Sequence, residues 1–333
     1  MVALPKKWVR EMGLRQGSEI IITRPSLTSL LVTAEVVAPV RETQEAAIEV
    51  SEKLTSDSIF REIVSLYVLG YSQIHLRGGI GAFATTKRDA IKELVRRHLV
   101  GTEGLADSGD KTTIQVLLGY TELSVDNALK KMLLITTSMC REAMKALESD
   151  DKRLAKSVIE RDEEVGRFSL YVIRQLNMSM GRGIAKDSNL DPRDILVYIQ
   201  VTRFMDRIAS HACRMAEVVL GLENKIPEHV NARLGSMNKY ASGLVEEALL
   251  SLFKRDHVGA DLVVEKAKHF VVMEDDLIGS LGGSGFEESY TLHVLIDSQK
   301  RIAEYARDIA EVVLDLTVER VIRKEILDYP RAA

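Results

Sequence analysis

Cysteine is scarce in this chain, which contains only Cys140 and Cys213 among its 333 residues. The two residues form neither a CxxC pair nor the spacing of a metal knuckle. We therefore expect both cysteines to be small core residues in a protein of a reducing, cytoplasmic setting.

Long uncharged apolar runs are also missing. No window of about eighteen residues is apolar enough to suggest a membrane span, and the first residues lack the pattern of a signal peptide. The net charge of −4 argues against a protein that coats nucleic acid throughout. Hydrophobic residues make up 46% and charged residues 28% of the chain, which is typical of a globular protein. The sequence thus predicts a cytoplasmic protein of several domains, with no direct membrane insertion.

A near-repeat is the most informative feature that the sequence does contain. Residues 206–222 read DRIASHACRMAEVVLGL, residues 300–316 read KRIAEYARDIAEVVLDL, and ten of the seventeen positions are identical. In both segments apolar residues recur at steps of four and three, beginning at Ile208 and at Ile302. This spacing predicts an apolar seam on a helix that packs inside a bundle.

Two weaker echoes extend the repeat toward the N-terminus. Residues 129–147 are similar to residues 234–252, and RDEEVG (161–166) is similar to EDDLIG (274–279). Each half then has three corresponding helices in the same order. The predicted fold is mainly α, with two tandem three-helix bundles preceded by a small α+β domain and a β-rich N-terminal module. The predicted boundaries are 1–40 for the module, 41–119 for the α+β domain, 120–223 and 224–322 for the bundles, and 323–333 for a tail.

The segment before the bundles alternates between helix and strand patterns. Short β-branched runs and amphipathic runs between residues 41 and 119 predict a compact domain with its helices on one face of a small sheet. Asp57 and Thr85 are candidate N-caps of the two helices. In the N-terminal module, Gly13 suits the residue that follows a short helix.

The repeated segments resemble the PhoU family of phosphate-uptake regulators. Members consist of two repeated three-helix bundles, each with a DxxID-like middle helix and a final helix like LERIGDHAxNIAE. Here the final-helix motif corresponds to residues 205–217 and 300–311, and LDPRDI (190–195) corresponds to the stretch that opens the first of these helices. The resemblance covers about residues 124–322. It implies a regulator that docks onto phosphate-transport or signalling proteins, is not an enzyme, and holds iron or zinc on carboxylates.

Residues 3–32 separately resemble the AbrB/SpoVT swapped-hairpin module, through LPKKW (4–8), MGL (12–14) and GSE (17–19). The combination is similar to an archaeal PhoU arrangement and implies a homodimer formed through this module. The family module begins with a strand about ten residues earlier than Met1, so we expect either a start further upstream or an incomplete half-barrel.

Basic residues are concentrated in the same N-terminal segment. Residues 1–24 carry a net charge of +3, and the candidate DNA-binding residues are Lys6, Lys7, Arg10 and Arg15. Clustered positive charge on a small module is typical of contact with a phosphate backbone. The alternative, a solvated face on a dimerisation module, remains open.

The candidate metal ligands are the carboxylates that remain in the family motif positions. Residues four apart share a helix face and can converge on one cation. The four pairs are Asp162 with Gly166, Asp275 with Gly279, Asp206 with Ser210, and Lys300 with Glu304. Each pair keeps one carboxylate, so the predicted ligands are Asp162, Asp206, Asp275 and Glu304, and a solvated acidic face is the alternative.

Some further residues carry no complete motif. RGGIGAFATTK (77–87) places glycines before a helix but lacks the Gly-Lys-Ser/Thr of a nucleotide-binding loop. His211 lies at the edge of the apolar seam and is predicted as an interface histidine. Three residues in or just after one predicted helix are candidates for an interface or a ligand pocket: Arg61, Tyr67 and Tyr71.

Three functions follow from these features. The first is a regulator of phosphate uptake that acts by protein docking. The second is an AbrB-type DNA-binding transcription regulator with a helical sensor body. The third, a helical metalloenzyme, lacks the Glu-x-x-His and HExxH patterns of such sites.

Overall fold

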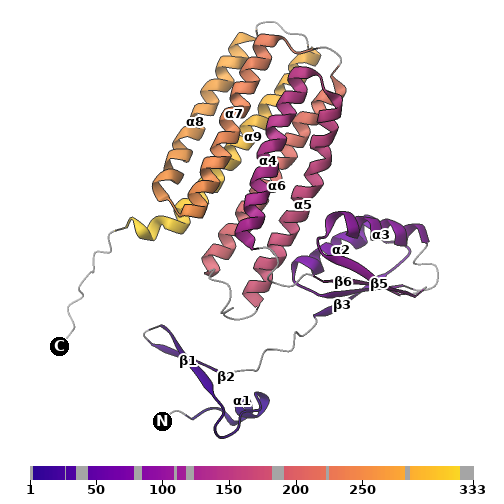
Figure 1. The fold of residues 1–333 in the computed structure, drawn as a ribbon, viewed down its shortest axis with the longest axis vertical. Helices are drawn as coiled ribbons and strands as arrows, with labels where there is room; N and C mark the ends of the chain where they lie inside the picture. Colours follow the sequence, from indigo (N-terminus) through magenta and orange to yellow (C-terminus); the bar gives the residue numbers. More distant parts are fainter. Residues whose placement is uncertain are drawn as a thin grey trace, which may run out of the picture. The chain divides into compact units, whose positions relative to one another are not determined.

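The computed structural model describes residues 3–26, 28–34, 44–78, 85–108, 111–117, 124–181, 191–222, 225–281 and 286–322. The chain divides into two compact units, Met1–Gln44 and Glu45–Ala333. The second unit contains an α+β domain followed by six long helices (Figure 1), which confirms the mainly helical fold class. Within the described ranges, no helix is both long and apolar enough to cross a membrane.

The N-terminal unit has very little core. Helix α1 (Lys6–Glu11) contains no buried residue, and β1 (Ile20–Ser26) forms an antiparallel hairpin with β2 (Ser29–Ala34). Ile22 and Leu30 of this hairpin are 57% and 64% exposed. Because an isolated two-stranded hairpin is only marginally stable in water, the unit needs further apolar contacts to be stable.

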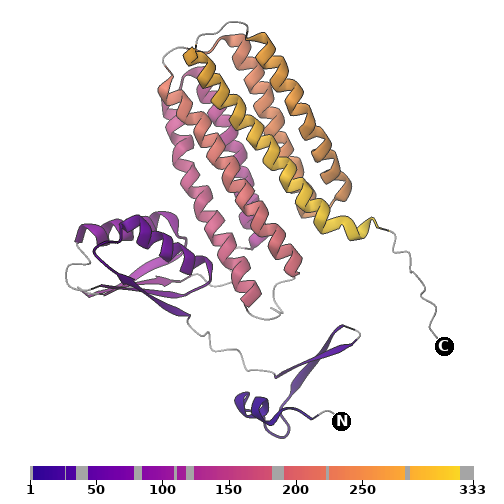
Figure 2. The same cartoon turned by 180° about the vertical axis from the view of Figure 1, so that it is seen from behind.

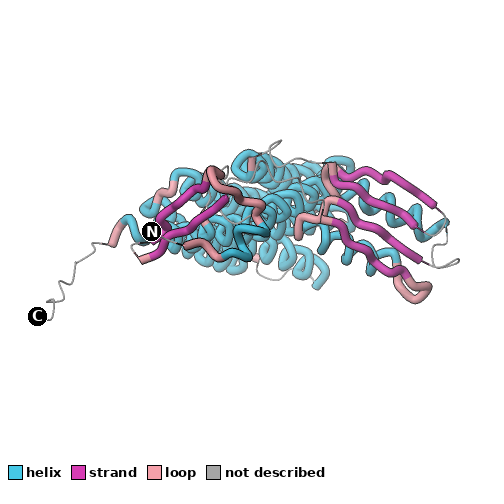
Figure 3. Tube along the Cα trace, turned by 90° about the horizontal axis from the view of Figure 1, so that it is seen from below, coloured by secondary structure: helices cyan, strands magenta, loops and turns pink. Residues whose placement is uncertain are grey.

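The α+β domain has one four-stranded sheet with the strand order β3-β4-β6-β5. β3 and β4 are parallel, and the other neighbours are antiparallel. The strands lie side by side in one layer, and both helices cover the same face (Figures 1 and 3), as the sequence predicts. The elements are β3 (Glu45–Val50), α2 (Ser56–Val68), β4 (Gln73–Gly78), α3 (Thr85–His98), β5 (Thr102–Ser108) and β6 (Lys111–Val116).

The N-cap of α2 differs from the sequence prediction. Thr55 is the N-cap, and its hydroxyl oxygen accepts a hydrogen bond of 3.1 Å from the backbone N–H of Ser58. Asp57 instead lies in the first turn, where its negative charge still favours the helix N-terminus. Thr and Asp are both good caps, so residue type alone did not distinguish the two positions.

Six helices form the rest of the second unit. Several begin at side-chain caps: Ser124 and Asp256 cap α4 and α8, and Asp191 opens α6 with a capping box and Pro192 in the first turn. The helices are α4 (Val125–Ser149), α5 (Lys152–Gly181), α6 (Pro192–Gly221), α7 (Glu228–Lys254), α8 (His257–Ser280) and α9 (Phe286–Thr317), followed by the short 3₁₀ helix η1 (Val318–Arg320).

The two bundles share one hydrophobic core. A single cluster of buried side chains extends from Ala128 on α4 to Val313 on α9. Within this cluster α6 packs against α9, and α4 packs against α7. The six helices therefore run side by side as one body (Figures 1 and 2).

The structure confirms the duplication. Ile208, Ala212 and Val219 of α6 are at most 1% exposed, and so are their counterparts in α9 at a shift of 94 positions. Buried positions of α4 and α7 correspond in the same way at a shift of 105, as in Leu129 and Leu234. The two final helices thus bury matching faces in equivalent surroundings.

The turns after α4 and α7 show how the middle helices correspond. Asp150 and Arg255, which end these two helices, both adopt the left-handed conformation, with φ of 54° and 51°. The shift of 105 therefore continues into α5 and α8, where Ala155 and Ala260 are both fully buried. This finding corrects the predicted pairing of residues 161–166 with residues 274–279, which assumes a shift of 113.

A buried arginine joins the α+β domain to the first bundle. Arg174 of α5 donates hydrogen bonds to the main-chain oxygens of Tyr67, Gly70 and Tyr71, at the C-terminal end of α2. Its guanidinium also lies 4.9 Å from the centre of the Tyr67 ring. The last carbonyls of a helix lack intrahelical donors. Here the Tyr67 oxygen accepts from the N–H of Gly70 as well as from Arg174, and Arg174 also supplies the oxygens of the turn that follows α2.

Further contacts extend this junction along α5. Asn177 donates a hydrogen bond of 2.8 Å to the main-chain oxygen of Val68. Gly70 has φ of 99°, and a Cβ at this residue would lie 2.8 Å from Cγ of Met178. The positive φ of Gly70 favours glycine at this position, and a larger residue would also displace the Met178 side chain.

Candidate functional site

The structure brings two of the predicted carboxylates close together. Asp162 on α5 and Asp206 on α6 are both partly buried. Burial, with the negative charges of Asp206 and Glu217, raises the pKa of Asp162 to about 6. Burial also raises the pKa of Asp206, although Arg203 and Arg207 act in the opposite direction. The α5/α6 surface thus concentrates negative charge in a partly desolvated place.

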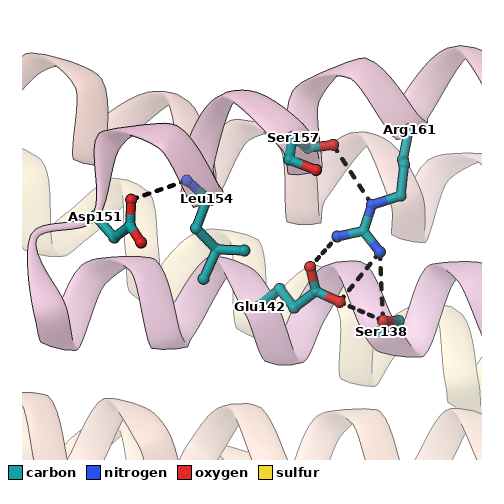
Figure 4. Close-up of polar contacts among 6 residues, drawn as sticks. All are labelled: Ser138, Glu142, Asp151, Leu154, Ser157 and Arg161. Atoms are coloured by element: carbon teal, nitrogen blue, oxygen red, sulfur yellow. Dashed lines mark hydrogen bonds and ion pairs between the residues drawn. The ribbon is translucent and has the colours of Figure 1, made fainter.

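The neighbouring cation does not neutralise this charge. Arg161 precedes Asp162 but is directed toward α4, where it forms a two-point ion pair with Glu142 (Figure 4). The same guanidinium donates to the hydroxyl of Ser138 and to the main-chain oxygen of Ser157. The charges that act on Asp162 are thus those of the neighbouring carboxylates, which together with burial raise its pKa.

Cys213 lies beside the same carboxylates. Its sulfur is 3.9 Å from Oε1 of Glu217. Burial and the charges of Asp162 and Glu217 raise the pKa of the Cys213 thiol to about 12. The thiol is therefore neutral at physiological pH and is a poor metal ligand or nucleophile in this state.

We expect Asp162→Asn to stabilise the protein at pH 7. The folded-state pKa of Asp162 is about 6 and its ordinary value is 3.8, so the ionised carboxylate costs free energy in the folded state. The difference corresponds to at most about 3 kcal/mol, and solvent screening of the partly exposed group reduces this to about 1 kcal/mol. The gain in unfolding free energy over the wild type is complete above pH 6 and disappears as the pH falls toward 4. Urea unfolding at both pH values measures it.

A matched variant separates this effect from a general loss of charge. Asp261 is an exposed carboxylate on α8, and Asp261→Asn is expected to leave the unfolding free energy unchanged at both pH values. An Asp162→Asn protein that is less stable than the wild type at pH 7 contradicts the assignment.

The second copy arranges its charges differently. Lys300, the counterpart of Asp206, forms an ion pair of 2.8 Å with Glu274 on α8. Glu304 forms an ion pair of 2.8 Å with Arg301. Asp275 is exposed and lies on the side of α8 that faces α7. The two predicted ligands of this copy, Asp275 and Glu304, thus have surroundings that differ from each other. The ammonium group of Lys300 neutralises Glu274, the residue next to Asp275.

The metal site remains a prediction. Within the described ranges, no three histidine, cysteine, aspartate or glutamate side chains are arranged to hold a metal ion. Among the residues that the structure describes, Asp162 and Asp206 lie together without a third well-placed ligand. Their aligned positions in the second copy are Ala267 and Lys300. The arrangement of these residues does not fit the carboxylate cluster that the family resemblance implies.

The predicted DNA-binding residues lie in the N-terminal unit. Lys6, Lys7, Arg10 and Arg15 are all exposed, and Lys7 is 3.9 Å from Glu11, one turn later. These side chains are accessible to an anionic partner, and DNA binding stays a prediction.

The remaining candidates are placed as follows. His211 packs against its own counterpart in the other copy, with 5.9 Å between the ring centres of His211 and Tyr305. It thus lies between the two copies, although its buried Nδ1 has no hydrogen-bond partner among the described residues. Tyr67 and Tyr71 belong to the junction with α5, whereas Arg61 is exposed. Residues 79–84 of the glycine-rich stretch lie outside the described residues.

The contacts of Arg174, a buried residue of the junction, are not among the sequence predictions. An arginine in the middle of an amphipathic helix is normally exposed, and its neighbours in sequence gave no motif. One signal was available: Arg174 follows Tyr171, Val172 and Ile173 in a run that is apolar on all sides, which is typical of a helix covered on more than one face.

Comparison with known proteins agrees with this architecture. Residues 129–219 match the family model of the PhoU domain. The matched segment begins in α4 and ends in α6, so it corresponds to the first copy of the duplication.

Two curated relatives carry the PhoU name. The chain is 37% identical over 89 residues to a phosphate-specific transport system accessory protein PhoU homolog of Borreliella burgdorferi, a match that covers 26% of this chain and 39% of the relative. A protein of the same description from Zymomonas mobilis is 24% identical over 187 residues, covering 54% of this chain and 77% of the relative. The first match thus spans less than half of that PhoU relative.

Two solved PhoU structures share the fold. The crystal structure of PhoU from Pseudomonas aeruginosa has a TM-score of 0.50 and 21% identity, and it covers 59% of this chain and 96% of its own. The phosphate transport system regulatory protein PhoU from Streptococcus pneumoniae has a TM-score of 0.52 and 18% identity, and it covers 60% and 96%. These similarities support a PhoU-like fold over more than half of the chain.

Proposed function

We propose that this protein is an accessory regulator of phosphate transport that acts from the cytoplasm by docking onto transport or signalling proteins. The observation that carries the proposal is the match of residues 129–219 to the PhoU domain. The curated relatives are accessory proteins of phosphate-specific transport systems. The proposed activity is regulatory, through surfaces of the helical body, and not catalytic.

The experiment is the loss of regulation in a deletion strain. We expect deletion of the gene to remove the response of phosphate uptake to external phosphate, measured as the initial uptake of radiolabelled phosphate, and the full chain to restore that response. The tagged chain is also expected to co-purify with phosphate-transport proteins. An unchanged uptake response together with no such association rejects the proposal.

The N-terminal unit adds a second part to this proposal. We infer that it mediates homodimerisation, because Ile22 and Leu30 of its hairpin are exposed and α1 has no buried residue. Two hairpins that pack together bury the apolar surface that one hairpin leaves in water. The basic residues of the same unit would then be present twice, which is the arrangement that the predicted DNA contact requires.

A further inference from the structure

A groove of about 830 Å³ lies between α7 and α8 of the second copy. Its lining combines methionine and small side chains with a charged rim. The lining residues are Ala232, Arg233, Ser236, Met237, Met273, Asp275, Asp276, Gly279 and Ser280.

Differences between the two copies explain the groove. At the shift of 105, Ser236 corresponds to Lys131 and Gly279 corresponds to Arg174. In the first copy the ammonium of Lys131 lies 4.6 Å from the centre of the Phe168 ring, so the Lys131 side chain extends from α4 across to α5. Ser236 at the corresponding position of the second copy is too short to do the same.

The equivalent surface of the first copy is a docking surface. There the face of α5 that contains Glu163, Leu170 and Arg174 seats the α+β domain. Glu163 forms a two-point ion pair with Arg97 of α3, and Leu170 packs against the core of that domain. In the first copy this face thus already binds another folded domain of the same chain.

In the second copy nothing in the described part of the chain covers this face. The residues that correspond to Glu163, Leu170 and Arg174 are exposed: they are Lys268, Asp275 and Gly279. Val272, on the same side of α8, is 50% exposed. This surface is therefore exposed at the place where the first copy packs against the α+β domain.

The charged residues at the rim indicate which kind of partner the groove can bind. Within the described residues, the carboxylates of Asp275 and Asp276 have no cation within ion-pair distance, whereas Arg233 donates its hydrogen bond of 2.8 Å to the main-chain oxygen of Asp276. Met237 and Met273 offer a flexible apolar floor that adapts to an inserted aliphatic side chain. Acidic groups around an apolar floor are complementary to a helix with both lysine or arginine and leucine-like residues.

We propose that the groove between α7 and α8 docks a basic amphipathic helix of a partner protein. An aliphatic side chain of that helix occupies the floor at Met237 and Met273, and a lysine or arginine lies beside Asp275 and Asp276. This inference rests on the proposed function for the role of the partner, and it adds the surface and the partner's chemistry.

The test uses the full chain and two fluorescent synthetic peptides. One is an amphipathic helix of leucine and lysine, and its twin has glutamate at every lysine position. We expect fluorescence anisotropy to show binding of the lysine peptide only. Asp275→Lys with Asp276→Lys is expected to weaken this binding about tenfold or more, as for a central contact of an interface.

A second variant blocks the groove without a charge change. Gly279 has ordinary helical φ, and a Cβ there meets nothing within 4 Å, so Gly279→Trp fills the groove while the helix persists. We expect it to weaken binding to a similar extent with an unchanged melting temperature.

The control is a second pair of acidic residues on α8, Asp261 and Glu265, outside the groove. Asp261→Lys with Glu265→Lys is expected to bind the lysine peptide like the wild type. Equal weakening by both charge reversals, unimpaired binding by Gly279→Trp, or equal binding of the glutamate peptide overturns the proposal. If the peptide binds at the groove, but the deletion strain has a normal phosphate-uptake response and no phosphate-transport protein co-purifies, the proposed function is refuted and this inference stands.

Discussion

Replacing Arg174 with alanine is expected to reduce the unfolding free energy by about 2–4 kcal/mol, the largest effect of any single change considered. The substitution leaves the main-chain oxygens of Gly70 and Tyr71 without this donor, whereas the oxygen of Tyr67 still accepts from the N–H of Gly70. Each buried unsatisfied acceptor costs about 1–3 kcal/mol. The loss is smaller than the sum, because burial lowers the pKa of Arg174 and its removal relieves that desolvation cost.

Urea unfolding measures the loss, and hydrogen exchange of the α2 amides locates it. Faster exchange in α2 than in α9 is expected, because the junction opens before the shared core of the six helices. Arg193, whose ion pair with Glu319 is exposed on both sides, provides the control, and Arg193→Ala is expected to change stability by less than about 1 kcal/mol. Equal losses in the two variants would show that the buried position of Arg174 has no special importance.

Asp194→Ala is expected to cost about 2–3 kcal/mol. Asp194 is 2% exposed, and its Oδ2 lies 2.7 Å from Nη2 of Arg255 in the turn between α7 and α8. The same oxygen accepts a hydrogen bond from the backbone N–H of Asp191 in the capping box of α6. The variant loses a cap worth about 1 kcal/mol and a charge-assisted hydrogen bond worth about 1.5–3 kcal/mol, while the partly exposed Arg255 regains some hydration.

Asp194→Asn divides this loss into its parts. The amide oxygen retains the capping acceptor but not the charge, so we expect a loss between that of Asp194→Ala and zero, measured by urea unfolding at pH 7. Asp315 is an exposed carboxylate on α9, and Asp315→Ala serves as the matched control. If the alanine and asparagine variants of Asp194 are equally stable, the cap contributes nothing.

The helical fold was readable from the sequence because its signal is periodic. The seams that begin at Ile208 and Ile302 predicted two packed helices, and both are buried at matching positions. Gly13 was also predicted to follow α1, and it does so with φ of 61°. Periodicity fixed the face that each helix buries, but it left the alignment of the middle helices open to an error of about one heptad, which only the turn at Asp150 and Arg255 resolves.

The site was less predictable, because it depends on which side chains meet across helices. The motif positions predict Asp162 and Asp206 as ligands. These two residues do lie together, and their role stays a prediction. The same motif predicts Asp275, yet the corrected alignment places it on another face of its helix. No local pattern could indicate that Lys300 would reach Glu274, since that contact depends on the alignment of α8 against α9.

The continuous core also bears on how the molecule arose. Neither set of three helices encloses its own apolar surface, since α6 rests on α9 and α4 rests on α7. A chain with a single set of three helices would bury its apolar surface only by dimerising, so its folding would depend on concentration. Joining the two sets in one polypeptide makes this association intramolecular. Each set can then differ from the other in the residues outside the shared core.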